Sequence, residues 1–202
     1  MDLHGKLIAF EGVDGSGKST QARLLVDRLR SAGHTVTSTR EPGGTSIGED
    51  VRRLLLSHGS AALLPFSELL LFLVCRAQLI AEVIRPALDD GQVVITSRYR
   101  MSSLAFQGYG RGLDRTLIKQ LNEMATDAIE PDVVFLLDLP VDAALARLGH
   151  EGDRIEREAR AFHERVRRGY LEIAKDNART IVLNGLQPVD SVADEILEHL
   201  RR

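Results

Sequence analysis

A glycine-rich segment near the start of the chain constrains the fold more than any other feature. It matches the pattern G-x-x-x-x-G-K-[ST] in full and reads Gly12-Val13-Asp14-Gly15-Ser16-Gly17-Lys18-Ser19. An apolar run over residues 7–10 precedes it, and a helical pattern follows it. A glycine-rich turn between a strand and a helix can point successive backbone N–H groups inward, beside the positive end of the helix dipole. The segment therefore predicts a phosphate-binding loop at the end of a buried strand.

This loop indicates which residues bind a nucleoside triphosphate, but not what the chain does with it. Lys18 can reach the β- and γ-phosphates, and the Ser19 hydroxyl can ligate Mg²⁺. We expect ATP to be bound by Gly12, Val13, Asp14, Gly15, Ser16, Gly17, Lys18, Ser19 and Thr20. Because many families share this loop, the function has to be inferred from the other loops at the same edge of the sheet.

The rest of the chain alternates short apolar runs with longer helical patterns. The runs are nearly continuous in branched apolar residues, which is typical of parallel strands covered on both faces. The predicted strands are Lys6–Glu11, Thr35–Arg40, Val93–Arg98, Val133–Leu139 and Thr180–Asn184. The predicted helices are Ser19–Ala32, Glu49–Ser57, Ser67–Asp89, Leu113–Thr126, Asp142–Leu148, Ile155–Ala178 and Val189–Arg201. This alternation predicts a single α/β domain over residues 1–202, with three layers and a five-stranded parallel sheet flanked by helices.

One polar segment bounded by glycines, Gly149 to Arg154, lies between two predicted helices. Its composition suits a mobile lid, which we predict at about residues 147–156. An ordinary surface loop has the same composition, so both interpretations stay open at this point.

Composition excludes several classes of protein. The chain has 26 Lys and Arg against 29 Asp and Glu, a net charge of −3, which argues against a nucleic-acid or membrane-surface binder. The longest apolar stretch, residues 69–75, is shorter than the ~18–20 residues that a membrane span needs. Cys75 is the single cysteine, which excludes an intramolecular disulfide and fits a reducing compartment. We therefore expect a cytoplasmic protein that binds small molecules, with no nucleic-acid or membrane partner.

Groups suited to a second, anionic ligand occur at three further places. Phe72 and Arg76 lie four residues apart on one predicted helix, so a flat ring could stack on the first and be held at its edge by the second. Phe72 alone is more typical of a core residue than of a binding site. Arg98 ends the third predicted strand, beside the phosphate loop. The loop predicted over residues 99–111 combines polar groups, rings and glycines that suit a small ligand.

Taken together, these segments resemble bacterial thymidylate kinases. The matches occur in the family's order from Phe10 to about Tyr170, and the combination of residues 40–45 with the segment after Arg98 is specific to the family. The matching residues are Phe10-Glu11-Gly12, Thr20-Gln21, Arg40-Glu41-Pro42-Gly43-Gly44-Thr45, Leu71-Phe72 with Arg76, Arg98-Tyr99 with Ser102, Phe106-Gln107-Gly108 and Asp153-Arg154-Ile155-Glu156. The resemblance implies phosphoryl transfer from ATP to dTMP, giving dTDP and ADP, with Mg²⁺ as cofactor and a homodimer as the assembly.

The resemblance also implies roles for cationic residues. Lys18, Arg98 and Arg154 would be catalytic. Arg98 would hold the acceptor phosphate, with Arg40 assisting it. This agrees with the chemistry, because phosphoryl transfer depends mainly on positive charge and positioning.

The nucleoside part of the acceptor would contact a different set of side chains. Asp14 would accept a hydrogen bond from the 3′-hydroxyl, Phe72 would stack on thymine and Arg76 would donate to a base oxygen. Gln107 would approach the base or the sugar. The full set that the resemblance implies for the acceptor is Asp14, Arg40, Phe72, Arg76, Arg98, Ser102, Phe106 and Gln107.

The chain departs from the family pattern in how it handles metal. Ser97 stands where the family usually has Asp before the arginine, and serine is a weaker ligand than a carboxylate. Taken without the family, Asp138 is a candidate metal ligand, since it ends an apolar strand. Glu11 and Glu41 are the other possible substitutes.

Two further departures concern charge near the phosphates. Gly15 occupies the position where one subclass of the family has arginine. In the glycine subclass, lid arginines are thought to supply that charge, and the candidates here are Arg147 and Arg154. The lid is also shorter and less basic than the arginine-rich bacterial version.

Two other functions stay open from the sequence. The chain could be another phosphate-loop kinase acting on a different nucleoside or nucleotide, although two arginines near the acceptor favour a monophosphate. A nucleotide-dependent switch ATPase is the second alternative. A GTPase switch would need an Asn-Lys-x-Asp segment after a late strand, and Asn184-Gly185-Leu186-Gln187 does not fit that pattern.

Overall fold

The short apolar runs form one parallel sheet in the computed structural model, which describes residues 3–57, 63–148 and 152–201. The strands are β1 (Leu7–Glu11), β2 (Val36–Arg40), β3 (Val93–Ser97), β4 (Val133–Asp138) and β5 (Thr180–Asn184). They lie in the order β2-β3-β1-β4-β5, and each neighbouring pair is parallel. The predicted five-stranded parallel sheet is confirmed.

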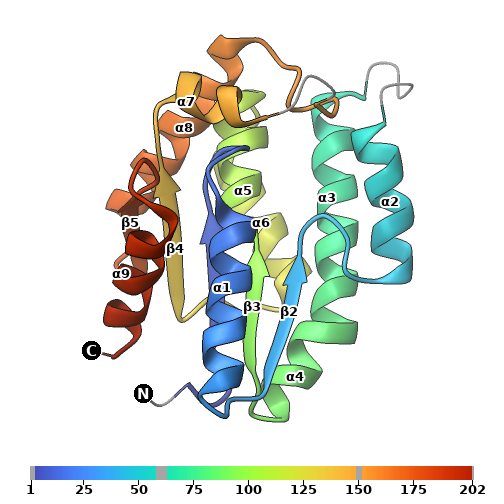
Figure 1. The fold of residues 1–202 in the computed structure, drawn as a ribbon. Helices are drawn as coiled ribbons and strands as arrows, with labels where there is room; N and C mark the ends of the chain where they lie inside the picture. Colours follow the sequence, from blue (N-terminus) through green and yellow to red (C-terminus); the bar gives the residue numbers. More distant parts are fainter. Residues whose placement is uncertain (1–2, 58–62, 149–151, 202) are drawn as a thin grey trace.

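Helices cover both faces of this sheet. They are α1 (Lys18–Ser31), α2 (Ser46–Leu56), α3 (Pro65–Leu79), α4 (Arg85–Asp89), α5 (Arg100–Ser103), α6 (Arg115–Thr126), α7 (Val141–Arg147), α8 (Arg160–Lys175) and α9 (Val189–Arg201), with π-helical segments η1 (Ile80–Ile84) and η2 (Leu104–Gly110). Because strand side chains alternate, Leu7 and Ala9 join one core with α3, α5 and α8, whereas Ile8 and Phe10 join another with α1 and α9. Figure 1 shows α1 and α9 together on the near side of the sheet. The predicted three-layer α/β fold is confirmed.

The predicted helix Ser67–Asp89 is longer and less regular than expected. It begins at Pro65, and proline is well tolerated there because the first N–H groups of a helix make no hydrogen bond within the helix. Pro86 does not end the helix, which continues to Asp89 through η1 and α4. Proline has no N–H to donate to the preceding turn, and the wider π-helical turn before Pro86 accommodates the absence of that hydrogen bond.

The loop predicted over residues 99–111 is wrong, because most of the segment is helical. It consists of α5 followed by η2. The glycines that signalled a loop instead allow close packing of the helical segment on its neighbours. A Cβ at Gly110 would lie 2.6 Å from the Phe162 ring on α8, and one at Gly108 would lie 3.1 Å from the Arg115 side chain on α6. Gly169 on α8 plays the same part from the other side, since a Cβ there would lie 2.6 Å from the Tyr109 ring.

The predicted helix Ile155–Ala178 also begins later, at Arg160. Asp153 explains the delay, because its Oδ1 accepts hydrogen bonds from the backbone N–H groups of Ile155 (2.8 Å) and Glu156 (2.9 Å). These bonds hold the segment in turns, as aspartate side chains commonly do before a helix. Of the lid predicted at about residues 147–156, residues 149–151 lie outside the described ranges.

Among the described residues, no helix combines the length and the apolar character that crossing a membrane would require.

Candidate active site

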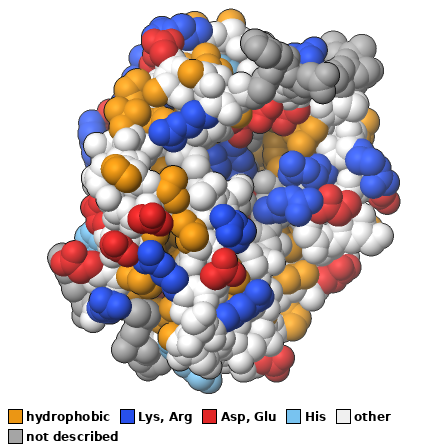
Figure 2. All heavy atoms as spheres, in the orientation of Figure 1, with side chains coloured by type: hydrophobic (Ala, Val, Ile, Leu, Met, Phe, Trp, Pro, Cys, Tyr) orange, Lys and Arg blue, Asp and Glu red, His pale blue; other side chains and the backbone are white. Residues whose placement is uncertain are grey.

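A cavity of about 670 Å³ lies at the carboxyl ends of the strands. One side is lined by residues 14–21, from the phosphate loop (residues 12–19) and the start of α1. The other side is lined by Arg40 after β2, Arg98 after β3 and Phe72 on α3, among other residues. Figure 2 shows lysine and arginine side chains gathered around the hollow on this face. In open parallel sheets, this edge is where ligands bind.

The phosphate loop leaves the start of α1 open toward the cavity. Gly17, with φ of +97°, precedes the helix, and no side chain caps its first N–H groups. Such a helix start attracts anions through its N–H groups and its dipole. Gly15 packs so closely on α7 that an added Cβ would lie 2.2 Å from the carbonyl oxygen of Ala144. This contact leaves no room for the arginine that one subclass has there.

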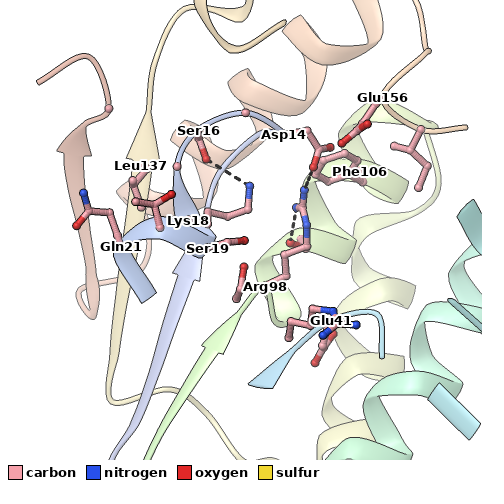
Figure 3. A pocket seen from close by; sticks show the side chains of 18 of the residues that line it. Asp14, Ser16, Lys18, Ser19, Gln21, Glu41, Arg98, Phe106, Leu137 and Glu156 are labelled. Carbon is pink, nitrogen blue, oxygen red and sulfur yellow. Dashed lines mark hydrogen bonds and ion pairs between the residues drawn. The ribbon is translucent and has the colours of Figure 1, made fainter. Parts of the chain in front are cut away.

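Lys18 is the cation of the loop, and it is buried. Its Nζ donates to the carbonyl oxygen of Val13 (2.7 Å) and to the Ser16 hydroxyl (3.3 Å), as Figure 3 shows for the second contact. Burial and the positive charge of Arg98 lower the pKa of Lys18 to about 7, although Asp14 partly offsets them. A phosphate group beside this ammonium would supply the negative charge that its surroundings lack.

Arg98 leaves β3 with φ of +74° and turns its side chain into the cavity. The guanidinium forms an ion pair with Asp14 (Figure 3) and donates through Nη1 to the hydroxyls of Ser102 (3.2 Å) and Tyr170 (3.3 Å). Burial lowers the pKa of Arg98, but Asp14, Tyr170 and Glu11 together outweigh burial, and the net effect raises it. The same pair holds the pKa of Asp14 below its usual value, although burial opposes this. Arg98 is therefore a fixed cation opposite the phosphate loop.

We call the side formed by Phe72, Arg98, Ser102, Phe106 and Gln107 the acceptor wall, since all five line the cavity. The Arg98 guanidinium stacks on the Phe106 ring, with 4.8 Å between the guanidinium carbon and the ring centre. The Ser102 hydroxyl donates to Glu11 (2.6 Å), and the Gln107 amide donates to Glu68 (2.9 Å). The structure therefore brings these five predicted residues to one cavity, but two of their polar groups already have protein partners.

Arg76 lies behind the acceptor wall and does not line the cavity. It is 1% exposed and forms a buried ion pair with Glu41. Its remaining hydrogen bonds go to Asn122, to the Ser103 hydroxyl (2.8 Å) and to the carbonyl oxygen of Tyr99 (3.0 Å). The predicted donation to a base oxygen would thus require one of these bonds to be exchanged.

The arginines predicted near the phosphates lie in different places. Arg147 lines the cavity and donates to the carbonyl oxygens of Gly15 (3.5 Å) and Gly185 (3.0 Å). Arg154 instead pairs with Glu68 (2.7 Å) on α3, away from the loop. Arg40 lines the cavity and pairs with Glu49 (3.0 Å). In this arrangement, Arg147 is the lid candidate that lies beside the phosphate loop.

Some of the candidate metal ligands line the cavity and others do not. Ser19 and Ser97 both line the cavity, so their hydroxyls are available to an ion shared with phosphate oxygens. Asp138 does not line it, because it forms a two-point ion pair with Arg167 at 2.8 and 2.9 Å. Glu11 is fully buried behind the wall. Within the described ranges, no group of three or more His, Cys, Asp or Glu side chains is arranged to hold a metal ion.

Among the cavity residues that the sequence prediction of the site missed are two charged ones, Arg52 and Glu156. Arg52 on α2 lines the cavity and donates to the carbonyl oxygen of Pro42 (2.7 Å). The turn over residues 42–44 brings α2 back to the sheet edge, and the glycines of that turn could have indicated that Arg52 lies near the site. Glu156 also lines the cavity, and burial raises its pKa. Its place in the matched segment 153–156 was the available signal.

Comparisons with known proteins agree with this geometry. A family model described as "Thymidylate kinase" matches residues 10–196. A thymidylate kinase from Geobacter sulfurreducens is 45% identical over 97% of this chain and 96% of its own length. One from Thermosipho melanesiensis is 48% identical over 94% of each chain. The crystal structure of thymidylate kinase from Ehrlichia chaffeensis superposes with a TM-score of 0.83 at 35% identity, covering 98% of this chain and 100% of that one.

The match thus extends through the phosphate loop, the acceptor wall and the lid, and it covers nearly the whole of each relative. With a family model over most of the chain and relatives well above 40% identity, this chain belongs to the thymidylate kinase family.

Proposed function

We propose that this chain transfers the γ-phosphoryl group of ATP to the phosphate of dTMP, giving dTDP and ADP. One observation carries the proposal: a single cavity has an anion-binding helix start on one side and a fixed arginine with two aromatic rings on the other. Phosphoryl transfer requires two phosphates to face each other in line, with positive charge around them. Membership of the thymidylate kinase family supports dTMP as the acceptor.

On the donor side, the phosphate loop would bind ATP. Lys18 would exchange its bond to Val13 for the β- and γ-phosphate oxygens, which stabilise its charged form. The Ser19 hydroxyl would hold Mg²⁺ together with phosphate oxygens, and Arg147 would add positive charge beside Gly15. When bound, Mg²⁺ would neutralise charge that develops on the phosphates.

On the acceptor side, Arg98 would hold the dTMP phosphate and Phe72 would stack on thymine. The Phe106 ring stacks against the Arg98 guanidinium, so Phe106 would affect dTMP binding through Arg98. Asp14 would accept the 3′-hydroxyl while it remains paired with Arg98. Arg40 would assist at the acceptor phosphate, for which it would have to leave Glu49.

An assay of ADP release tests the reaction and the choice of acceptor together. We expect rapid ADP release with dTMP, and only slow release with dGMP, with thymidine or with no acceptor. Rapid release with thymidine would identify a nucleoside kinase. Slow release that ignores dTMP would identify a nucleotide-dependent switch, and either result would overturn the proposal.

We also propose that the chain works as a homodimer. Helix α3 exposes an apolar row, Phe66, Leu70 and Val74, with 41–46% of each residue exposed at a spacing of four residues. Such a stripe is typical of a helix that packs on a partner. Sedimentation should give a dimer for the parent chain and a monomer for Leu70→Glu. A monomeric parent would contradict the proposal. A cytoplasmic location stays a prediction from the sequence.

A further inference from the structure

A buried carboxylate lies directly behind the acceptor wall, and no role in binding explains it. Glu11 ends β1, is 0% exposed and does not line the cavity. Its Oε1 accepts the backbone N–H groups of Tyr99 (2.8 Å) and Ser102 (3.1 Å). Its Oε2 accepts the hydroxyls of Ser102 (2.6 Å) and Tyr170 (3.0 Å). All four donors belong to segments that surround Arg98.

The two hydroxyls connect Glu11 to the Arg98 guanidinium. Nη1 of Arg98 donates to the Ser102 oxygen at 3.2 Å and to the Tyr170 oxygen at 3.3 Å. The two hydroxyl oxygens also lie 2.8 Å from each other. A hydroxyl has one proton and two lone pairs, so a proton directed to Glu11 or to the other hydroxyl leaves a lone pair for Arg98. The charge of Glu11 therefore orients both hydroxyls as acceptors toward Arg98.

Glu11 also holds the backbone that carries Arg98. A φ of +74° is unfavourable for a residue with a side chain, and it persists only where surrounding contacts maintain it. Two such contacts flank the residue: Arg98 N donates to the Phe10 carbonyl oxygen (2.8 Å), and Tyr99 N donates to Glu11. Glu11 thus constrains both the main chain and the side chain of Arg98.

We propose that Glu11 is a positioning residue for phosphoryl transfer, acting through Ser102 and Tyr170 to fix the Arg98 guanidinium where the acceptor phosphate binds. This rests on the proposed role of Arg98. Ser102 then serves dTMP through Arg98, and its hydroxyl is already committed to Glu11 and Arg98.

The sharpest variant is Glu11→Gln, which keeps the shape and reverses one hydrogen bond. The amide oxygen can still accept the two backbone N–H groups, so the amide nitrogen must face the two hydroxyls. It donates to them and redirects a hydroxyl proton toward Arg98. We expect KM for dTMP to rise at least tenfold and KM for ATP to change less than twofold. Glu11→Asp should recover part of the loss, because it restores the charge.

Two buried tyrosines provide a matched pair if Glu11→Gln does not fold. Tyr170 and Tyr99 are each 1% exposed, but the Tyr99 hydroxyl donates to the carbonyl oxygen of Ile129 (3.0 Å), outside the network. Tyr170→Phe and Tyr99→Phe should lower the unfolding temperature by similar amounts. KM for dTMP should rise roughly three- to tenfold in Tyr170→Phe alone. Equal KM values in the two variants would overturn the proposal.

Arg98→Ala separates this inference from the proposed function. If Arg98→Ala leaves KM for dTMP unchanged, the role proposed for Arg98 fails. If Arg98→Ala raises that KM but Tyr170→Phe does not, Arg98 binds the acceptor without the help of Glu11 and only the inference fails. In an Arg98→Ala background, Tyr170→Phe should cause no further rise, because its effect passes through Arg98.

Discussion

Lys18 in the phosphate loop and Arg98 in the acceptor wall face the same cavity, but their surroundings differ. Lys18 is held by a backbone carbonyl and a hydroxyl from its own loop. Arg98 is held by Asp14, Ser102 and Tyr170, and through them by Glu11. Burial lowers the pKa of both cations, and it prevails at Lys18, whereas at Arg98 the combined effect of Asp14, Tyr170 and Glu11 outweighs it.

Lys18 donates to neutral groups and is suited to pair with a phosphate that binds later, whereas Arg98 is positioned by a carboxylate before any ligand binds. Within the described part of the chain, Lys18 forms no ion pair, so it can exchange its neutral contacts for phosphate oxygens at little cost. Arg98 is already held by Asp14, Ser102 and Tyr170 without a ligand, and a cation positioned in advance keeps the reorganisation during a reaction small. The same contrast extends behind the wall, where Arg76 is fixed by Glu41.

The largest expected effect is on the stability of the acceptor side. Arg76→Ala would leave Glu41 as an unpaired buried charge, which costs about 3–5 kcal/mol of unfolding free energy. Urea unfolding at pH 7 measures this cost. Arg160→Ala, which breaks an exposed ion pair with Asp142, is the control and should change little. A small loss in Arg76→Ala would mean that Arg76 serves dTMP more than the fold.

The donor side should respond in rate instead of stability. Lys18→Ala removes the charge beside the transferring phosphate, and kcat should fall by about 10²–10³-fold. Circular dichroism should show an intact fold. Lys175→Ala removes the same charge from an exposed position on α8 and should keep its rate. A near-normal kcat in Lys18→Ala would contradict the mechanism.

The pH dependence of stability can sharpen the contrast further. In the nucleotide-free protein, the Lys18 pKa of about 7 lies below the ~10.4 of an unfolded lysine. Between these values the unfolded state holds the extra proton, so the contribution of Lys18 to stability rises with pH. Below about pH 7, both states hold it and the cost of burying the charge is fully present.

Comparing Lys18→Met with the parent chain isolates this contribution. The variant should be more stable than the parent at pH 6.5, and the difference should shrink toward pH 9.5. Urea unfolding at both values without nucleotide measures it. A difference that is constant with pH would show that Lys18 keeps an ordinary pKa.

The contrast also explains which parts of the site could be predicted from the sequence. The phosphate loop is a contiguous motif in which Lys18 bonds to Val13 and Ser16, so its residues and their neighbours are local. The sheet was predictable for a similar reason, because β1 and β3 are mostly apolar and are buried along their whole length. The residues of the acceptor wall were grouped through the family resemblance, and the structure places all five at one cavity.

Their partners were not predictable, because they come from distant segments. Glu41 lies 35 positions from Arg76, and Tyr170 lies 72 positions from Arg98. No local sequence pattern shows that the guanidinium of Arg76 already forms an ion pair with a buried carboxylate. The helical state of residues 100–110 was missed because its glycines serve packing on α6 and α8, whereas glycine in a sequence is most often typical of a turn.

The smallest expected effect concerns the metal, where the chain has serine instead of the carboxylate usual in the family. Ser97 lines the cavity, and a carboxylate there would add a ligand type that Mg²⁺ prefers. Ser97→Asp should lower the Mg²⁺ concentration at half-maximal rate by a few-fold, with kcat at saturating Mg²⁺ nearly unchanged. Ser38→Asp makes the same charge change at an exposed position of β2 and should leave the titration as it is. If both variants titrate like the parent, the ion does not reach Ser97, and Ser19 with the nucleotide phosphates would account for its binding. If Ser97→Asp instead raises KM for dTMP, the new carboxylate competes with the acceptor phosphate for Arg98. That result would place the two anions closer together than the fixed position of Arg98 implies.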